Sequence, residues 1–289
     1  MILENRVISG RPLLSFDDIL EREDYVICDS GIADSGIEDL YPLNHFLEIP
    51  TPLLKRQLGG VELFLQLLED PGVITVPGVS REIKIARELL GSKLRYLLAD
   101  TRRLSNGNRK RLMYKCRNKI KRLKRIQELH HILYQTLKRK AFAPREKPVY
   151  NFLESVVLSV AKNSDAKIDF GNSYGHESPR PVEDFHTDEQ LVAMAIYLSC
   201  VEGKSGGILT GDSDIKRILR NTIFYLAHSG HAGYREIINL VAKNPIKVYH
   251  IELPREAGIS WDSSWNFSRG NISFISQERM AQIRAELGQ

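Results

Sequence analysis

The stretch from Gly206 to Ile215 constrains the fold of this chain more than any other. It reads Gly-Gly-Ile-Leu-Thr-Gly-Asp-Ser-Asp-Ile, a short apolar run with glycines before it and acids after it. Such a run is typical of a buried parallel strand. Because ligands of open α/β sheets bind just outside the carboxyl ends of the strands, we expect Asp212 and Asp214 at the mouth of a crevice.

The two acids that follow this run have two interpretations. Carboxylates so close together repel each other unless a cation lies between them, and a hard ion such as Mg²⁺ prefers oxygen ligands. Alternatively, the segment is a solvated turn in which an Asp caps the helix predicted from Ile215 onward. The remaining acids of the chain decide between these interpretations.

Three other apolar runs predict further strands of the same sheet. They cover residues 25–31, 73–77 and 245–251, and helical patterns separate them. The first ends in Asp29 and Ser30, so Asp29 is expected at a strand's carboxyl end. This alternation predicts the α/β class, as a three-layer α/β/α domain with a central parallel sheet.

Two more acids are expected near the starts of helices. Glu82 would lie in the first turn of a helix capped by Ser80, and Asp188 in the first turn of a helix that follows a Thr187–Gln190 capping box. Taken singly, each is a surface acid that the helix dipole favours. Taken with the acids that end strands, they are expected to converge on one edge of the sheet.

Charge is divided unevenly along the chain. The 289 residues include 41 Lys and Arg and 36 Asp and Glu, a net charge of +5. Residues 93–147 hold 19 of the basic residues and 3 of the acidic ones, a local balance of +16 that leaves −11 for the remainder. Such asymmetry indicates a polyanionic partner.

The basic segment is predicted to be an inserted helical hairpin. A long helix over 109–140 follows a turn at 106–108, and its apolar seam can face the helix before it. The lack of balancing acids favours binding of phosphate backbones, which supplies affinity without sequence choice. A protein partner and a merely solvated face are the alternatives. The candidate binding residues are Arg109, Lys110, Arg111, Lys115, Arg117, Lys119, Lys121, Arg122, Lys124 and Arg125.

Several classes of protein are excluded. The three cysteines form no CxxC or zinc-type spacing, which favours a reduced, cytoplasmic compartment. No signal peptide and no membrane-spanning run is recognised. The sequence Gly203-Lys204-Ser205 follows a predicted helix and lacks the first glycine of a phosphate loop, so we expect no nucleotide-triphosphate site.

The ordered set of acids resembles the pattern of PIN-domain nucleases. Its elements are Val26-Ile27-Cys28-Asp29-Ser30, then Glu82, then Asp188 before an Ala-rich helix, then Leu209-Thr210-Gly211-Asp212-Ser213-Asp214. The resemblance covers residues 25–251 without the insertion. The chain departs from compact members in the long gap between Glu82 and Asp188, which the hairpin and a polar loop over 164–186 fill. Glu88 is a nearby rival for the role of Glu82.

The resemblance implies a metal-dependent endoribonuclease that leaves a 5′-phosphate and a 3′-hydroxyl. It implies Mg²⁺ or Mn²⁺ held first by Asp29, Asp188 and Asp212, with Glu82 and Asp214 as further ligands or supports. Ser30 and Thr210 would orient water or a carboxylate. The basic hairpin would hold the RNA backbone across the acidic cleft.

The expected organisation has four parts. Residues 1–24 form a leader, 25–92 and 148–251 the PIN-like domain, 93–147 the insertion and 252–289 a tail. RNA is the expected partner, and a regulatory protein or a homo-oligomer is compatible with the sequence. The alternatives are an inactive RNA-binding relative, a structure-specific DNA nuclease, and a toxin-type ribonuclease controlled by a separate antitoxin.

Overall fold

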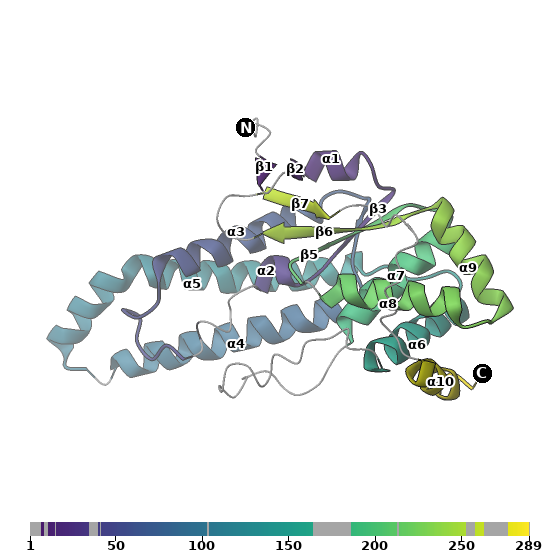
Figure 1. Cartoon of the computed structure of the whole chain (residues 1–289). Coiled ribbons are helices and arrows are strands. Elements are labelled where there is room, and N and C mark those ends of the chain that lie inside the picture. The colour runs from purple at the N-terminus through teal and green to yellow at the C-terminus, as the bar shows by residue number, and fades with distance from the viewer. Residues whose placement is uncertain are drawn as a thin grey trace.

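The computed structural model describes residues 7–8, 11–14, 16–34, 40, 42–102, 104–163, 186–212, 214–252, 258–262 and 277–288. Figure 1 shows the arrangement of its elements. The strands are β1 (Val7–Ile8), β2 (Arg11–Leu14), β3 (Tyr25–Cys28), β4 (Val73–Ile74), β5 (Gly206–Thr210), β6 (Ile246–Glu252) and β7 (Gly258–Asp262). The helices are α1 (Phe16–Leu20), α2 (Gly31–Asp34), α3 (Thr51–Leu67), α4 (Pro77–Arg102), α5 (Asn106–Lys140), α6 (Lys147–Asn163), α7 (Thr187–Cys200), α8 (Asp214–His228), α9 (Ala232–Lys243) and α10 (Gln277–Glu286). The predicted loop over 164–186 lies outside the described residues except for His186.

The strands form one sheet in the order β1-β2-β7-β6-β5-β3-β4. The four strands β4, β3, β5 and β6 are parallel, so the predicted α/β class with a parallel sheet is confirmed. The sheet continues through antiparallel β7, β2 and β1, which were not predicted. The N-terminal and C-terminal segments of the chain therefore both contribute strands.

Helix α7 lies at the centre of the packing. Its residues from Leu191 to Leu198 are all fully buried, so it has no polar face. It contacts β5 and β6 on one side and α6 and α8 on the other. In Figure 1, α6, α7 and α8 lie on one side of the strands and α1 lies on the other. A helix enclosed on every side is expected to be apolar all round.

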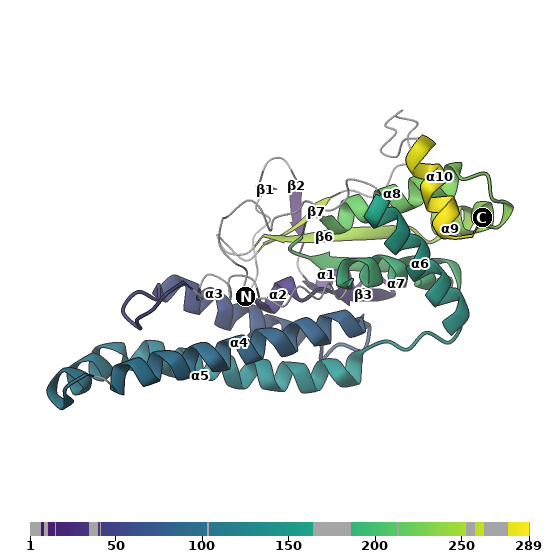
Figure 2. The same ribbon diagram turned by 90° about the horizontal axis from the view of Figure 1, so that it is seen from below.

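Helices α4 and α5 run side by side as the predicted hairpin (Figures 1 and 2). The predicted turn over 106–108 is wrong, because α5 already begins at Asn106. Near the turn, Leu94, Leu97, Ile120 and Leu123 form a core with the start of α3. Nearer the sheet, the leucines of α5 join the main core of the α/β part. The predicted boundaries of the insertion remain a prediction. The end of α5 nearer the sheet packs in the main core, so the hairpin is anchored there.

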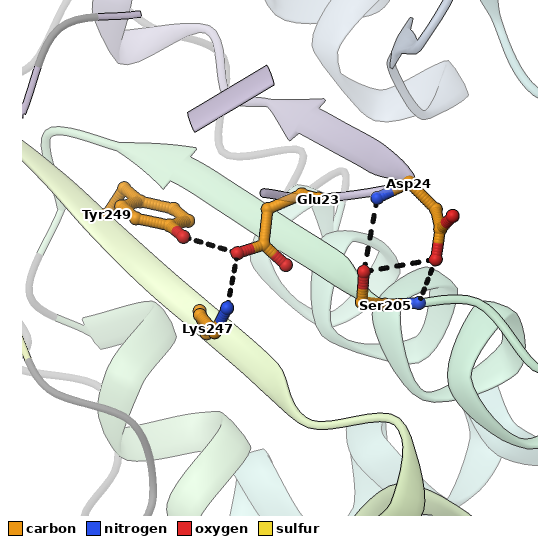
Figure 3. A network of polar contacts seen from close by, with 5 residues as sticks. All are labelled: Glu23, Asp24, Ser205, Lys247 and Tyr249. Carbon is orange, nitrogen blue, oxygen red and sulfur yellow. Dashed lines mark hydrogen bonds and ion pairs between the residues drawn. The ribbon is translucent and has the colours of Figure 1, made fainter. Parts of the chain in front are cut away.

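Polar contacts connect residues 23 and 24 with residues of β6 and with Ser205, near the starts of the parallel strands (Figure 3). The carboxylate of buried Glu23 accepts hydrogen bonds from Lys247 Nζ at 2.6 Å and from Tyr249 Oη at 2.5 Å. Beside it, Ser205 N donates to Asp24 Oδ2 at 2.8 Å. Gly207 makes this packing feasible, because a Cβ there would lie 2.8 Å from the Tyr249 ring.

Candidate functional site

Asp29 and Asp212 follow two neighbouring strands at the same edge of the sheet. Strands β3 and β5 pair in parallel with Cys28 opposite Leu209, and Asp29 N donates to Leu209 O at 3.0 Å. The two acids therefore follow adjacent strand ends, as predicted. Asp29 is buried and Asp212 is half-buried.

Thr210 connects these two acids. Its Oγ1 donates to Asp29 Oδ2 at 2.8 Å and accepts the backbone N–H of Asp212 at 2.8 Å. The same hydroxyl group thus positions the Asp29 carboxylate and the backbone that follows β5. Thr210 was predicted to orient a carboxylate, and this contact is consistent with that role.

Glu82 reaches the same site from α4, where two hydroxyl groups hold its carboxylate. Ser30 Oγ lies 2.5 Å from Glu82 Oε2, and Thr187 Oγ1 donates to Glu82 Oε1 at 2.6 Å. Ser30 Oγ also lies 3.4 Å from Asp29 Oδ1. The rival Glu88 is exposed and lies beside Arg87 on the hairpin. We call Asp29, Ser30, Glu82, Thr187, Thr210 and Asp212 the carboxylate network.

Two predictions about helix starts are wrong. Helix α4 begins at Pro77, so Ser80 is inside it, with its Oγ donating to Pro77 O, and Glu82 lies beyond the first turn. Helix α7 begins at Thr187 with no side-chain cap, because the Thr187 hydroxyl donates to Glu82 instead. The side chain of Gln190 accepts the N–H of Gly78 at 2.9 Å.

The starts of α4 and α7 approach each other closely at Gly78. A Cβ at this position would lie 2.5 Å from Thr187 Oγ1, so any other residue would push the two helices apart. This close approach brings Thr187 within hydrogen-bonding distance of Glu82. Sequence analysis missed Thr187 as a site residue, and the close approach at Gly78 is visible only in the structure.

The carboxylate network combines burial with several neighbouring negative charges. Burial and the negative charges of Glu82 and Asp212 together raise the pKa of Asp29 to about 7, and burial is the largest cause. The hydrogen bonds from Thr210 and from the Ser30 backbone act in the opposite direction. The negative charges of Glu82 and Asp212 therefore favour a positive charge, a proton or a cation, beside Asp29.

Asp214 differs from the other predicted ligands. It is buried at the first turn of α8, and its Oδ1 forms an ion pair with Arg217. Its backbone N–H donates to Asp212 Oδ1 at 2.8 Å, so Asp212 binds an amide at the start of α8. This contact agrees with the alternative interpretation of the segment, in which an Asp caps the helix that follows.

Asp188 lies in the first turn of α7, as predicted, and it is half-buried. It directly follows Thr187, the residue through which α7 joins the carboxylate network. The network thus links β3, α4, α7 and β5, the four elements on which the acids were predicted.

The atoms of the network suit a hard cation by their chemistry. They are carboxylate and hydroxyl oxygens, the ligands that Mg²⁺ and Mn²⁺ prefer, and they surround an acid with a raised pKa. Among the residues described, no group of three His, Cys, Asp or Glu side chains is placed to hold a metal ion.

The predicted basic residues lie along α5. Eight are exposed, whereas Lys119 and Arg122 are half-buried. Lys119 Nζ donates to Leu47 O at 2.8 Å, and Arg125 pairs with Glu128 at 3.8 Å. A groove of about 1040 Å³ runs between α4 and α5, lined in part by Arg87, Glu88, Arg95, Arg125, Glu128 and His131. The hairpin therefore presents an extended, mostly basic surface.

No protein-family model, no curated protein and no solved structure matches the chain. No helix in the described part of the chain combines the length and the hydrophobicity that crossing a membrane requires. The interpretation of the site accordingly depends on the residues themselves.

Proposed function

We propose that the protein is a PIN-like, metal-dependent endoribonuclease. The observation that carries the proposal is the carboxylate network, in which acids from separate elements meet and the charges of Glu82 and Asp212 raise the pKa of Asp29. Such a cluster costs folding free energy, and a function that requires a cation would explain why it exists.

The proposed cation is Mg²⁺ or Mn²⁺, held first by Asp29, Asp188 and Asp212. When bound, such an ion activates a water molecule and stabilises charge on the phosphate and on the leaving oxygen. Thr210 and Ser30 orient carboxylates through their hydroxyl groups. Glu82 is a further ligand or support, and Asp214, which pairs with Arg217, supports the start of α8. Since three ligands are not yet grouped, we expect the carboxylates to rearrange on metal binding.

The proposed role of the hairpin is to hold the RNA. Carboxylates repel a phosphate backbone, and the basic residues of α5 offset that repulsion. The eight exposed residues contact phosphates in this proposal, while Lys119 also fixes the segment at Leu47. Backbone contacts alone do not select a sequence.

One observation favours a second candidate, an RNA-binding relative that does not cleave. The hydroxyl groups of Ser30, Thr187 and Thr210 already engage the carboxylates, and the described residues group no three metal ligands. In this alternative the carboxylate network is an inherited structural feature, and the basic hairpin alone carries the function.

The deciding experiment is cleavage of a mixed RNA pool with Mg²⁺ or Mn²⁺. We expect cleavage that requires the metal and that Asp212→Asn reduces at least about 100-fold, as loss of a group essential to transition-state stabilisation does. Glu236→Gln is the matched control, because Glu236 is an exposed acid of α9 outside both the network and the hairpin, and its loss should leave the rate unchanged.

Other outcomes separate the alternatives. RNA binding without cleavage under any metal would favour the binding protein. Cleavage of branched DNA but not of RNA would indicate the structure-specific DNA nuclease. Growth arrest on expression, relieved by Asp212→Asn, would indicate a toxin-type ribonuclease and motivate a search for its antitoxin.

A further inference from the structure

The first turns of α5 form a protruding tip. In Figures 1 and 2 they extend past the end of α4. Every residue from 104 to 111 is exposed, so neither α3 nor the body of the hairpin covers them. A helix end that projects in this way exposes its residues to a large ligand from several sides.

The tip carries positive charge that no acid of the same segment balances. The segment 104–117 contains no Asp or Glu and five basic residues, all exposed. Like charges this close destabilise a helix, and the segment has no acids with which they could form ion pairs along the helix. The five residues are Arg109, Lys110, Arg111, Lys115 and Arg117.

Tyr114 stands among these cations with its ring uncovered. It is 79% exposed, more than any other large hydrophobic residue in the described part of the chain. Lys110, Arg111 and Arg117 lie four residues before, three before and three after it, which places them beside it on the same helix face. Tyr96 on α4 is different, because it is 52% exposed and Lys93 Nζ lies 5.3 Å from the centroid of its ring.

We infer that the tip of α5 binds unpaired nucleotides, with one base stacked on Tyr114 and the flanking phosphates on the surrounding cations. The inference rests on the proposed function, since it names the form of RNA that the hairpin recognises. Aromatic platforms within positive grooves bind single strands because every unpaired base offers a face for stacking. In a duplex the base faces are already stacked on one another, so no base face is available to stack on the Tyr114 ring. Single-stranded segments and loops are therefore the preferred substrates.

The experiment measures RNA affinity in EDTA by fluorescence anisotropy, with a short unstructured RNA and with the matching duplex. Tyr114→Leu should weaken binding of the single strand at least about fivefold, the low end of what stacking on one aromatic ring contributes. Its effect on the duplex should stay below about twofold. Tyr114→Phe keeps the ring and should restore single-strand binding. Tyr96→Leu is the matched control and should change neither affinity.

The outcomes separate the inference from the proposed function. Equal affinity of wild type and Tyr114→Leu for the single strand would overturn the inference while leaving the basic hairpin as an RNA site. Equal losses in Tyr114→Leu and Tyr96→Leu would also overturn it. If the wild type binds no RNA of either form, the proposal that the hairpin holds RNA fails as well, and a protein partner becomes the occupant of the tip. Cleavage plays no part in this assay, because EDTA removes divalent ions.

Discussion

The carboxylate network and the basic hairpin carry opposite charges and hold them in opposite ways. In the network, buried or half-buried acids share hydroxyl partners, and the charge of one acid changes the pKa of another. Along α5, most charges are exposed. A buried cluster of this kind is expected to respond to a substitution as a unit, whereas a solvated surface responds residue by residue.

The largest expected effect concerns how the stability of the protein depends on pH. The pKa of Asp29 is raised to about 7 in the folded protein, whereas its ordinary value is 3.8. Between these pH values the folded protein keeps a proton on Asp29 that the unfolded chain has released. Stability should therefore fall as pH rises between these values, by up to about 4 kcal/mol. Denaturant unfolding of wild type and Asp29→Asn in EDTA tests this, and only the wild type should show the decline.

A control and a second readout accompany this experiment. Asp17→Asn changes an exposed acid and should behave as wild type. Adding Mg²⁺ at pH 8 should stabilise the wild type and not Asp29→Asn, because a bound ion compensates the ionised carboxylate. A flat pH profile would contradict the buried charge, and no gain with the metal would argue against the proposed ion.

A smaller effect is expected from removing one hydroxyl of the network. Thr210→Val keeps the shape but loses the hydrogen bonds to Asp29 Oδ2 and to the N–H of Asp212. We expect a loss of about 1.5–3 kcal/mol at pH 8, since a hydrogen bond to a charged group is removed. The pKa of Asp29 in the folded state should rise further, which extends the decline in stability to higher pH.

Thr75→Val is the matched control for that variant. Thr75 is equally buried, but its hydroxyl donates to the carbonyl oxygen of Cys28 rather than to a carboxylate. Its loss should cost about 1 kcal/mol with an unchanged pH profile. If both variants shift the profile alike, Thr210 does not act through the charge of Asp29.

The smallest effects are expected on the hairpin. Arg111→Gln and Lys115→Gln remove exposed charges, so each should change the unfolding free energy by less than about 0.5 kcal/mol. Each should lower the salt dependence of single-strand binding by about 0.7 in slope if the residue contacts a phosphate. Lys119→Gln is the contrasting variant, because it also loses a hydrogen bond to Leu47 O. Strong coupling between Arg111 and Lys115 would show that the basic surface also responds as a unit.

Sequence reasoning predicted the parts of the fold that depend on local patterns. The parallel strands were found because strands buried on both faces read as short, mainly apolar runs. The added strands β1, β2 and β7 were missed because each has five residues or fewer, too few to show a clear period of two.

The site was predictable to the same extent. Asp29 and Asp212 were predictable because each comes shortly after a recognisable strand. The hydrogen bond between Thr187 and Glu82 was not, because it joins residues 105 positions apart and replaces the helix cap expected from Thr187. The ion pair between Asp214 and Arg217 has a spacing of three residues, so a closer examination of helix neighbours would have found it.

The pairing of β3 with β5 has a consequence for how the chain folds. The residues that β3 meets in β5 lie about 180 positions later, whereas α4 and α5 meet across a few residues. During synthesis the hairpin can assemble while β5 is still unmade. The carboxylate network therefore forms only after β5 has been synthesised, when the residues of the basic surface have already been made.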